Sequence, residues 1–291
     1  MTVPPPTPKR PLNAPAAVAI TARRTSLHGM GGHTTGVSAP TAETVAEALR
    51  PLTAAPERAG IFLDVDGTLA PIVARAEDAH VPERTAAILE RLAARYAVVA
   101  GVSGRGAEDA RELVGLDAIW YAGSHGAELL APGARRPEVL PAFEAWTGRV
   151  REFAGRHRDA EARLEDKGPI VAYHWRGASD EEAARERLEA IARAAEAEGL
   201  IAHWGRKVLE IRPGVPVDKG QAVDELVRRA GARTALYAGD DATDLDGFDA
   251  VERTGGVKVG VASEEGPDEI VERADLVVDG TDGVLRVLES L

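Results

Sequence analysis

Short apolar runs alternate with amphipathic segments in two separate stretches of the chain. In the first stretch, apolar runs bounded by turn residues predict strands, and apolar positions at helical spacing predict the helices between them. The elements predicted there are strand 61–64, helix 82–95, strand 97–102, helix 106–114 and strand 118–121. The alternation returns near the C-terminus, with helix 219–230, strand 234–239, helix 243–252, strand 257–260, strand 275–278 and helix 281–289. Strands that alternate with helices predict a parallel sheet covered by helices.

The segment between these two stretches has a different order of elements. We predict helix 137–158, strands 162–166 and 169–175, helix 179–198, and strands 200–204 and 207–212. Strands that follow one another directly favour an antiparallel sheet with helices on one face. The predicted fold class is therefore α/β, with a Rossmann-like parallel-sheet core that has helices on both faces, and an inserted α+β cap domain. The predicted domains are a flexible, proline-rich leader 1–40, an additional helix within 41–58, a core formed by 59–125 and 213–291, and a cap formed by 126–212.

Two acidic clusters follow predicted strands. Asp64 and Asp66 close strand 61–64, and Asp240, Asp241 and Asp244 follow a later strand. The carboxyl ends of parallel strands lie at one edge of a sheet, where ligands bind, so the clusters are expected to meet. Carboxylates held close together repel unless a cation joins them, and oxygen ligands suit Mg²⁺. We predict one Mg²⁺ site that is shared by the Asp64 and Asp66 pair and the second cluster. Asp240 is the first choice, and Asp241 and Asp244 are expected to complete the outer shell or to hold a lysine. A plain acidic turn at a helix N-terminus is the alternative, most of all for Asp244.

Other polar residues at this edge suit a phosphoryl group. Ser103 and Gly104 follow a predicted strand, Lys219 begins a predicted helix, and Gly67 follows the first acidic pair. A hydroxyl, backbone N–H groups and an ammonium are donors that bind phosphate oxygens. We predict a phosphate site that joins these four residues to Asp64. The simpler alternatives are a helix cap for Ser103 and a solvated position for Lys219.

The order of these segments resembles that in the haloacid dehalogenase-like phosphatases. The matching signatures are an Asp-x-Asp-Gly-Thr run, a serine that ends a strand, a lysine, and an acidic run that begins Gly-Asp-Asp. The resemblance implies that Asp64 is a nucleophile that forms an aspartyl-phosphate, and that Asp66 exchanges the proton with the leaving group and with water. It also implies catalytic roles for Ser103 and Lys219. The cofactor that it implies is Mg²⁺, held by Asp64, the backbone carbonyl of Asp66 and a carboxylate of the second cluster. Arg105 is expected to form a structural ion pair.

A narrower resemblance, to the trehalose-6-phosphate phosphatases, extends over nearly all of 60–291. It is carried by the segments 121–128, 165–168 with 173–176, 205–213 and 239–244. It implies hydrolysis of trehalose 6-phosphate in trehalose biosynthesis and a functional link to a trehalose-6-phosphate synthase. Charged cap residues are suited to the many hydroxyls of a disaccharide, and cross-strand ion pairs are the alternative. The predicted substrate-binding residues are His125, Glu165, Lys167, His174, Arg176, Lys207 and Glu210.

Composition restricts the partners of the chain. Its 291 residues carry a net charge of −12, which opposes nonspecific attraction to nucleic acid or anionic membranes. The absence of cysteine excludes disulfides and thiolate chemistry. No apolar run approaches the length of a membrane span, and the N-terminus lacks an apolar signal region, so we expect a cytoplasmic monomer. Phosphatases for sucrose phosphate or for mannosyl- or glucosyl-3-phosphoglycerate, a sugar phosphomutase, and a catalytically silent binding module remain alternatives.

Overall fold

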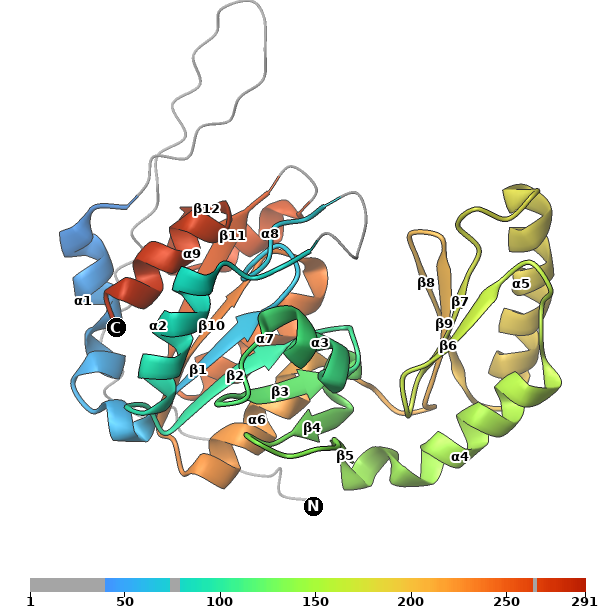
Figure 1. Ribbon diagram of the computed structural model, residues 1–291, viewed down its shortest axis with the longest axis horizontal. Helices are drawn as coiled ribbons and strands as arrows, with labels where there is room; N and C mark the ends of the chain where they lie inside the picture. Colours follow the sequence, from blue (N-terminus) through green and yellow to red (C-terminus); the bar gives the residue numbers. More distant parts are fainter. Residues whose placement is uncertain (1–39, 74–78, 264–265) are drawn as a thin grey trace, which may run out of the picture.

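The computed structural model describes residues 40–73, 79–263 and 266–291. These residues form two sheets that lie in two parts of the molecule (Figure 1). The first sheet has eight strands in the order β12-β11-β10-β1-β2-β3-β4-β5, and the second has four in the order β6-β7-β9-β8. The predicted leader lies outside the described residues except for Pro40.

The eight-stranded sheet is parallel from β12 to β3 and ends in an antiparallel hairpin. Its central strand β1 pairs with β10 on one side and with β2 on the other, and all six of its residues are buried. Helices cover both faces, which is why parallel strands of this kind are apolar along their whole length. The strands are β1 (Ala59–Asp64), β2 (Val98–Val102), β3 (Trp120–Gly123), β4 (Glu128–Leu130), β5 (Glu138–Val139), β10 (Thr234–Gly239), β11 (Val257–Ala262) and β12 (Leu276–Asp279).

Two apolar clusters hold the helices against this sheet. On one face pack α1 (Ala42–Thr53), α2 (Glu83–Ala93), α3 (Ala107–Val114) and α9 (Gly280–Glu289). The other face carries α6 (Lys219–Ala230), α7 (Leu245–Arg253) and α8 (Asp268–Arg273). Short 3-10 turns are η1 (Pro56–Arg58), η3 (Ser124–Gly126) and η4 (Ala242–Asp244). The helix predicted within 41–58 is α1, and it packs on the core through buried apolar side chains.

The second sheet and two helices form a cap with its own apolar cluster. The cap elements are α4 (Pro141–Arg156), β6 (Arg163–Asp166), β7 (Val171–His174), α5 (Glu181–Ala197), β8 (Ile201–Gly205) and β9 (Val208–Arg212). Helix α4 joins the two parts, because Phe143 belongs to a core cluster and Phe153 to the cap cluster (Figure 1). On β9, Leu209 and Ile211 pack in the cap cluster, so Glu210 points to the opposite, open face of the sheet.

The α/β class, the parallel core and the α+β cap are confirmed, and two details differ from the prediction. Strands β4 and β5 extend the core sheet, so the chain leaves that sheet only before Pro141, later than the predicted boundary at residue 126. Each of these strands has three residues or fewer, too few to show a periodicity. Helix α8, also short, was not predicted.

Candidate active site

The predicted core residues meet at the carboxyl ends of three adjacent strands. Asp64 is the last residue of β1, Ser103 follows β2, and Asp240 follows β10. The parallel register of β1 with both neighbours brings these ends to one edge of the sheet. The expectation that the two acidic clusters lie together therefore holds for Asp64 and Asp240.

Lys219 lies at the centre of this edge and is almost fully buried. Its Nζ donates to Asp64 Oδ1 at 2.5 Å and to Asp244 Oδ1 at 2.6 Å. Burial alone lowers the pKa of Lys219, but the two carboxylates more than offset this effect, so its pKa is raised. Lys219 is thus a charged ammonium inside the site, and the solvated alternative is wrong.

Asp244 binds this lysine, and both of its carboxylate oxygens accept further hydrogen bonds. Its Oδ2 accepts the backbone N–H groups of Asp240 and Asp241, each at 3.0 Å. Its Oδ1 accepts the hydroxyl of Tyr237 at 2.8 Å, in addition to Lys219. Tyr237 was not predicted as a site residue, because its place in an apolar strand gave no sign that its hydroxyl reaches the acidic turn.

Three buried carboxylates form the group that could hold a metal. Oxygens of Asp64, Asp240 and Asp244 lie within 4.8 Å of one another. Asp64 Oδ2 is buried and has no hydrogen-bond partner among the described residues, which suits a cation or a phosphoryl group. Thr68 donates to Asp240 Oδ1 at 3.2 Å. The donor set fits Mg²⁺, because all of its atoms are carboxylate oxygens.

Burial also perturbs these carboxylates. The pKa of Asp64 is raised by burial and by Asp244, against the opposing effect of Lys219. Burial and Asp244 raise the pKa of Asp240 to about 7. A divalent cation favours the ionised form of such groups. A bound metal would therefore lower the raised pKa values of Asp64 and Asp240.

Asp241 and Gly67 have structural places beside this cluster. The Asp241 side chain is exposed and accepts the N–H of Ala242 at 2.5 Å, so it caps η4 and does not join the buried carboxylates. Gly67 has a φ of +89°, and a Cβ there would lie 2.3 Å from an oxygen of Asp240. Only glycine leaves room for that carboxylate.

Asp66 and Ser103 are organised by Arg105. The guanidinium donates to Asp66 through Nε at 2.8 Å and through Nη2 at 2.6 Å, a bidentate pair. The Arg105 N–H donates to Ser103 Oγ at 3.1 Å. Arg105 forms the ion pair expected of it, and its partner is the carboxylate predicted to move protons. Gly104 lies between Ser103 and Arg105, and its carbonyl faces the cap.

One group of charged cap residues reaches the core at this point. Lys167 Nζ donates to Glu210 Oε1 at 3.1 Å and to the carbonyl of Gly104 at 3.4 Å. Arg212 donates to Glu210 Oε2 at 2.6 Å and lies 3.2 Å from His125 Nε2. Burial raises the pKa of Glu210, but His125, Lys167 and Arg212 lower it by more, so it stays ionised. Arg212 was not predicted as a site residue, although it lies in segment 205–213, which carries the resemblance.

The pKa of His125 is lowered by burial, so this histidine tends to be neutral in spite of Glu210. Two further predicted residues pair on the open face of the cap sheet, where His174 Nε2 lies 2.6 Å from Glu165 Oε2.

The remaining two predicted cap residues lie elsewhere. Lys207 has a φ of +60° in the turn before β9 and bonds Glu181 on α5 at 2.5 Å, not the Glu210 group. Arg176 is exposed beyond the end of β7. The structure therefore brings His125, Lys167 and Glu210 together and leaves Lys207 and Arg176 outside that group.

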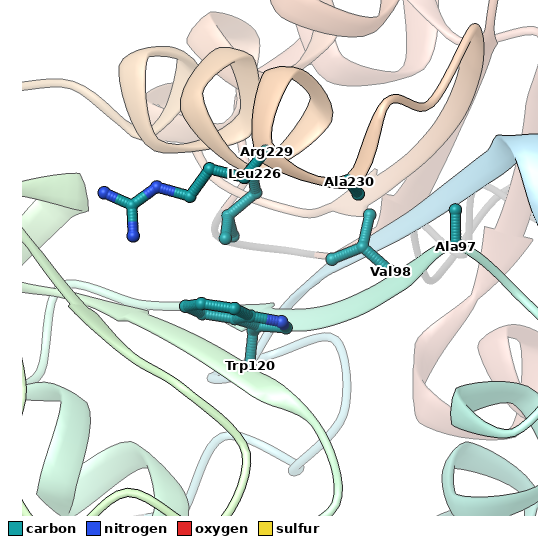
Figure 2. Close-up of a pocket in the computed structure, with 6 residues that line it drawn as sticks. All are labelled: Ala97, Val98, Trp120, Leu226, Arg229 and Ala230. Atoms are coloured by element: carbon teal, nitrogen blue, oxygen red, sulfur yellow. The ribbon is translucent and has the colours of Figure 1, made fainter.

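A small apolar pocket lies away from all of these residues (Figure 2). Val98 and Trp120 begin β2 and β3, so the pocket is at the amino edge of the sheet, opposite the site. Its lining consists of Ala97, Val98, Trp120, Leu226, Arg229 and Ala230. Among the described helices, none combines the length and apolar character that a bilayer crossing requires.

Comparison with protein families gives a match to the trehalose-phosphatase model over residues 62–276. This range contains the buried carboxylates, Lys219 and the whole cap. The chain belongs to the trehalose-phosphatase family.

Relatives of this family member include longer proteins. A trehalose-phosphate phosphatase of Mycolicibacterium paratuberculosis is 40% identical over 206 residues, which cover 66% of this chain and 51% of that protein. An uncharacterised glycosyl hydrolase of Mycobacterium tuberculosis is 40% identical over 210 residues, 68% of this chain and 16% of that protein. The chain thus spans about half or less of these curated relatives.

Solved structures agree with the family assignment. A "trehalose-6-phosphate phosphatase related protein" matches with a TM-score of 0.62 and 28% identity, over 79% of this chain and 95% of that one. Trehalose-6-phosphate phosphatase of Aspergillus fumigatus matches with a TM-score of 0.57 and 26% identity, over 87% and 98%. The chain therefore shares its fold with a trehalose-6-phosphate phosphatase and with a protein described as related to one.

Proposed function

We propose that this trehalose-phosphatase family member hydrolyses trehalose 6-phosphate to trehalose and inorganic phosphate, in a reaction that depends on Mg²⁺. The observation that carries the proposal is the buried Asp64, with one oxygen held by Lys219 and the other without a partner among the described residues. A carboxylate oxygen in this state is available to attack an electrophile. The neighbouring ammonium and hydroxyl suit the charge of a phosphoryl group.

In the proposed reaction, Asp64 Oδ2 forms a bond to phosphorus while the bond from phosphorus to the sugar oxygen breaks. Asp66 accepts from Arg105 through both oxygens in the structure, so it would first turn one oxygen away and take up a proton from solvent. It would then give that proton to the departing sugar oxygen. Water then attacks the phosphorus of the aspartyl-phosphate, Asp66 takes a proton from the water, and the bond to Asp64 breaks to release phosphate. Lys219 and Ser103 bind the phosphoryl oxygens during both steps, together with backbone N–H groups near Gly67 and Gly104.

Asp64, Asp240 and the backbone carbonyl of Asp66 would hold Mg²⁺, with Asp244 adjacent. The ion would supply positive charge that keeps these carboxylates ionised and neutralises the phosphate. Arg105 holds Asp66 in one orientation, and Asp244 holds Lys219 through its fixed carboxylate.

The cap would bind the sugar through the open face of its sheet and through the group at its contact with the core. Lys167 and Glu210 are hydrogen-bonding groups that pair with each other and have little exposure, and such groups suit recognition of sugar hydroxyls. His125, Glu165 and His174 border this region, whereas Arg176 and Lys207 would contact substrate only after movement of the chain. A functional link to a trehalose-6-phosphate synthase and a cytoplasmic location follow from the proposed reaction.

Phosphate release from trehalose 6-phosphate tests the proposal, measured with Mg²⁺ and with a chelator. Sucrose 6-phosphate, glucose 6-phosphate and mannosyl-3-phosphoglycerate are run in parallel. We expect turnover of trehalose 6-phosphate that requires Mg²⁺ and disappears in Asp64→Asn. Preference for another ester would overturn the substrate, and no turnover of any ester would favour a silent binding module.

A further inference from the structure

A strained turn lies at the contact between the core and the cap. Ser124, His125 and Gly126 have φ values of +52°, +56° and +98°. For residues with a side chain, this left-handed conformation is unfavourable and persists only where the surroundings impose it. The turn follows β3 and leads through Ala127 into β4, so it connects two strands of the core sheet.

This turn contacts both loops that carry phosphate-binding residues. The Ser124 N–H donates to the carbonyl of Arg105 at 2.6 Å, and the His125 N–H donates to the carbonyl of Ser103 at 3.0 Å. A Cβ on Gly126 would lie 2.5 Å from the carbonyl of Asp218, the residue before Lys219. The backbone of the turn therefore supports the Ser103 loop and the start of the Lys219 helix together.

The Ser124 side chain connects this turn of the core to the cap. Its buried hydroxyl lies 2.8 Å from the carbonyl of Lys167 and 3.3 Å from Glu128 Oε1. Lys167 belongs to the cap turn between β6 and β7, and Glu128 belongs to the core. A hydroxyl has one proton, so it can donate to only one of these two acceptors at a time. The shorter distance assigns the proton to the cap carbonyl.

Glu128 is a fixed alternative acceptor. Its Oε1 also accepts the N–H of Ala107 at 2.7 Å, at the start of helix α3 that follows the Ser103 loop. If Lys167 moves away, the Ser124 hydroxyl can turn to Glu128 and keep a partner. Glu128 Oε1 lies farther from the hydroxyl and already accepts the Ala107 N–H, so the bond to the Lys167 carbonyl is the better of the two. The exchange therefore favours the docked cap and still leaves the buried hydroxyl a partner when the cap moves.

We propose that Ser124 is a positioning residue that favours docking of the cap onto the phosphate-binding loops, with its hydroxyl bonded to Lys167 when the cap is docked and to Glu128 when it is not. This inference rests on the proposed function, because docking of the cap is assumed to serve the binding of the sugar part of the substrate. The hydroxyl contacts neither the carboxylate cluster nor Lys219, so the chemistry of the core does not require it directly.

Kinetics of Ser124→Ala and Ser124→Gly test this role. Both variants lack the hydroxyl, but only alanine keeps a side chain in the left-handed conformation, so the pair separates loss of the hydrogen bond from backbone strain. We expect both to raise KM for trehalose 6-phosphate by up to about five-fold, because about 1 kcal/mol for one neutral hydrogen bond is the upper limit when Glu128 replaces the carbonyl as acceptor. We expect little change with p-nitrophenyl phosphate, which has no sugar for the cap to bind. A change in one variant only, or equal changes for both substrates, would assign Ser124 a purely structural role.

A distance measurement tests cap docking without any turnover. The chain has no cysteine, so spin labels can be placed at Glu112→Cys on α3 and Glu196→Cys on α5. Both positions are exposed. With Ser124 present we expect one dominant distance between electron spins, and with either substitution a larger share of longer distances. Unchanged distances together with unchanged KM would overturn the inference. Failure of the parent protein to hydrolyse trehalose 6-phosphate would overturn the proposed function, while the distances would still decide the role of Ser124.

Discussion

Replacement of Asp240 by Asn is expected to stabilise the protein when no metal is bound. Asp240 is 4% exposed and shares a buried cluster with two other carboxylates. Its pKa in the folded protein is raised from 3.8 to about 7, mainly by burial and then by Asp244. The folded protein therefore holds the Asp240 proton more tightly than the unfolded chain does.

The direction of the pH dependence follows from this difference. Below pH 3.8 the carboxyl group is protonated in both states, and its contribution is fully present. As pH rises towards 7, the unfolded chain releases the proton first, so the free energy of unfolding falls by about 1.4 kcal/mol per pH unit. Above pH 7 the loss reaches roughly 4 kcal/mol. Asn cannot ionise and still accepts the hydroxyl of Thr68, so Asp240→Asn escapes this loss.

Urea unfolding at pH 5 and at pH 8, with a chelator, measures the effect. The variant should exceed the parent in free energy of unfolding at pH 8 by a few kcal/mol, on the order of 2 to 4, and by much less at pH 5. Mg²⁺ should stabilise the parent and have little effect on the variant, which should also lose phosphatase activity. Asp241→Asn is the matched control for stability, because its carboxylate is exposed.

Two results would refute this reasoning. One is a variant that is less stable than the parent at pH 8 without metal. The other is a free energy of unfolding that depends on pH in the same way in parent and variant. That result would show that the surroundings do not raise the pKa of Asp240. An equal gain in Asp241→Asn would assign the effect to net charge and not to burial.

Three other substitutions test single contacts of the site. Tyr237→Phe removes the hydroxyl bonded to Asp244, so the free energy of unfolding should fall by about 2 kcal/mol in denaturant titration, with a smaller loss in kcat. Arg105→Lys replaces a bidentate partner of Asp66 by a single donor, and kcat should fall about ten-fold for every ester in steady-state assays. Lys219→Met leaves its two buried carboxylates unpaired, so the protein should lose about 3–5 kcal/mol of stability without metal and about 10²–10³-fold in kcat.

Each of these predictions has its own contrary outcome. Full stability of Tyr237→Phe would mean that water replaces the hydroxyl. A loss in Arg105→Lys confined to sugar phosphates would place Arg105 in sugar binding instead. For Lys219, the stability control is Lys207→Met, because Lys207 and its partner Glu181 have side chains that are 43% and 37% exposed, so the loss should be less than about 1 kcal/mol. Equal losses in both lysine variants would contradict a special role for Lys219.

The sequence predicts elements well where local signals are strong. Helix α6 begins and ends as predicted, because Asp218 caps its N-terminus and Gly231, with a φ of +65°, ends it. Strand β10 also has its predicted bounds, since it is a continuous apolar run. Strands β4 and β5 could not be predicted, because their place in the sheet comes from long-range pairing and not from local pattern.

Site residues show the same division between local and long-range causes. Asp64 and Lys219 could be found from their positions at a strand end and a helix start. Which acidic residue after β10 enters the cluster could not, because it depends on the turn that buries Asp244 and exposes Asp241. Lys207 bonds Glu181 and not Glu210, since its turn directs it towards α5. Which charged side chains pair depends on the backbone geometry of such turns, and this geometry cannot be predicted from the amino-acid composition.

The separate apolar cluster of the cap has a consequence for how this protein can change over evolution. Residues of the cap sheet that face α4 and α5 maintain the fold, whereas Glu165, His174 and Glu210 project from the opposite face and belong to no apolar cluster. Under the proposed function, substitutions of Glu165 and His174 would therefore alter recognition with little loss of packing, whereas Glu210 also pairs with Lys167 and Arg212. Under the same proposal, new substrate preferences could arise in the cap while the buried carboxylates and Lys219 of the core stay unchanged.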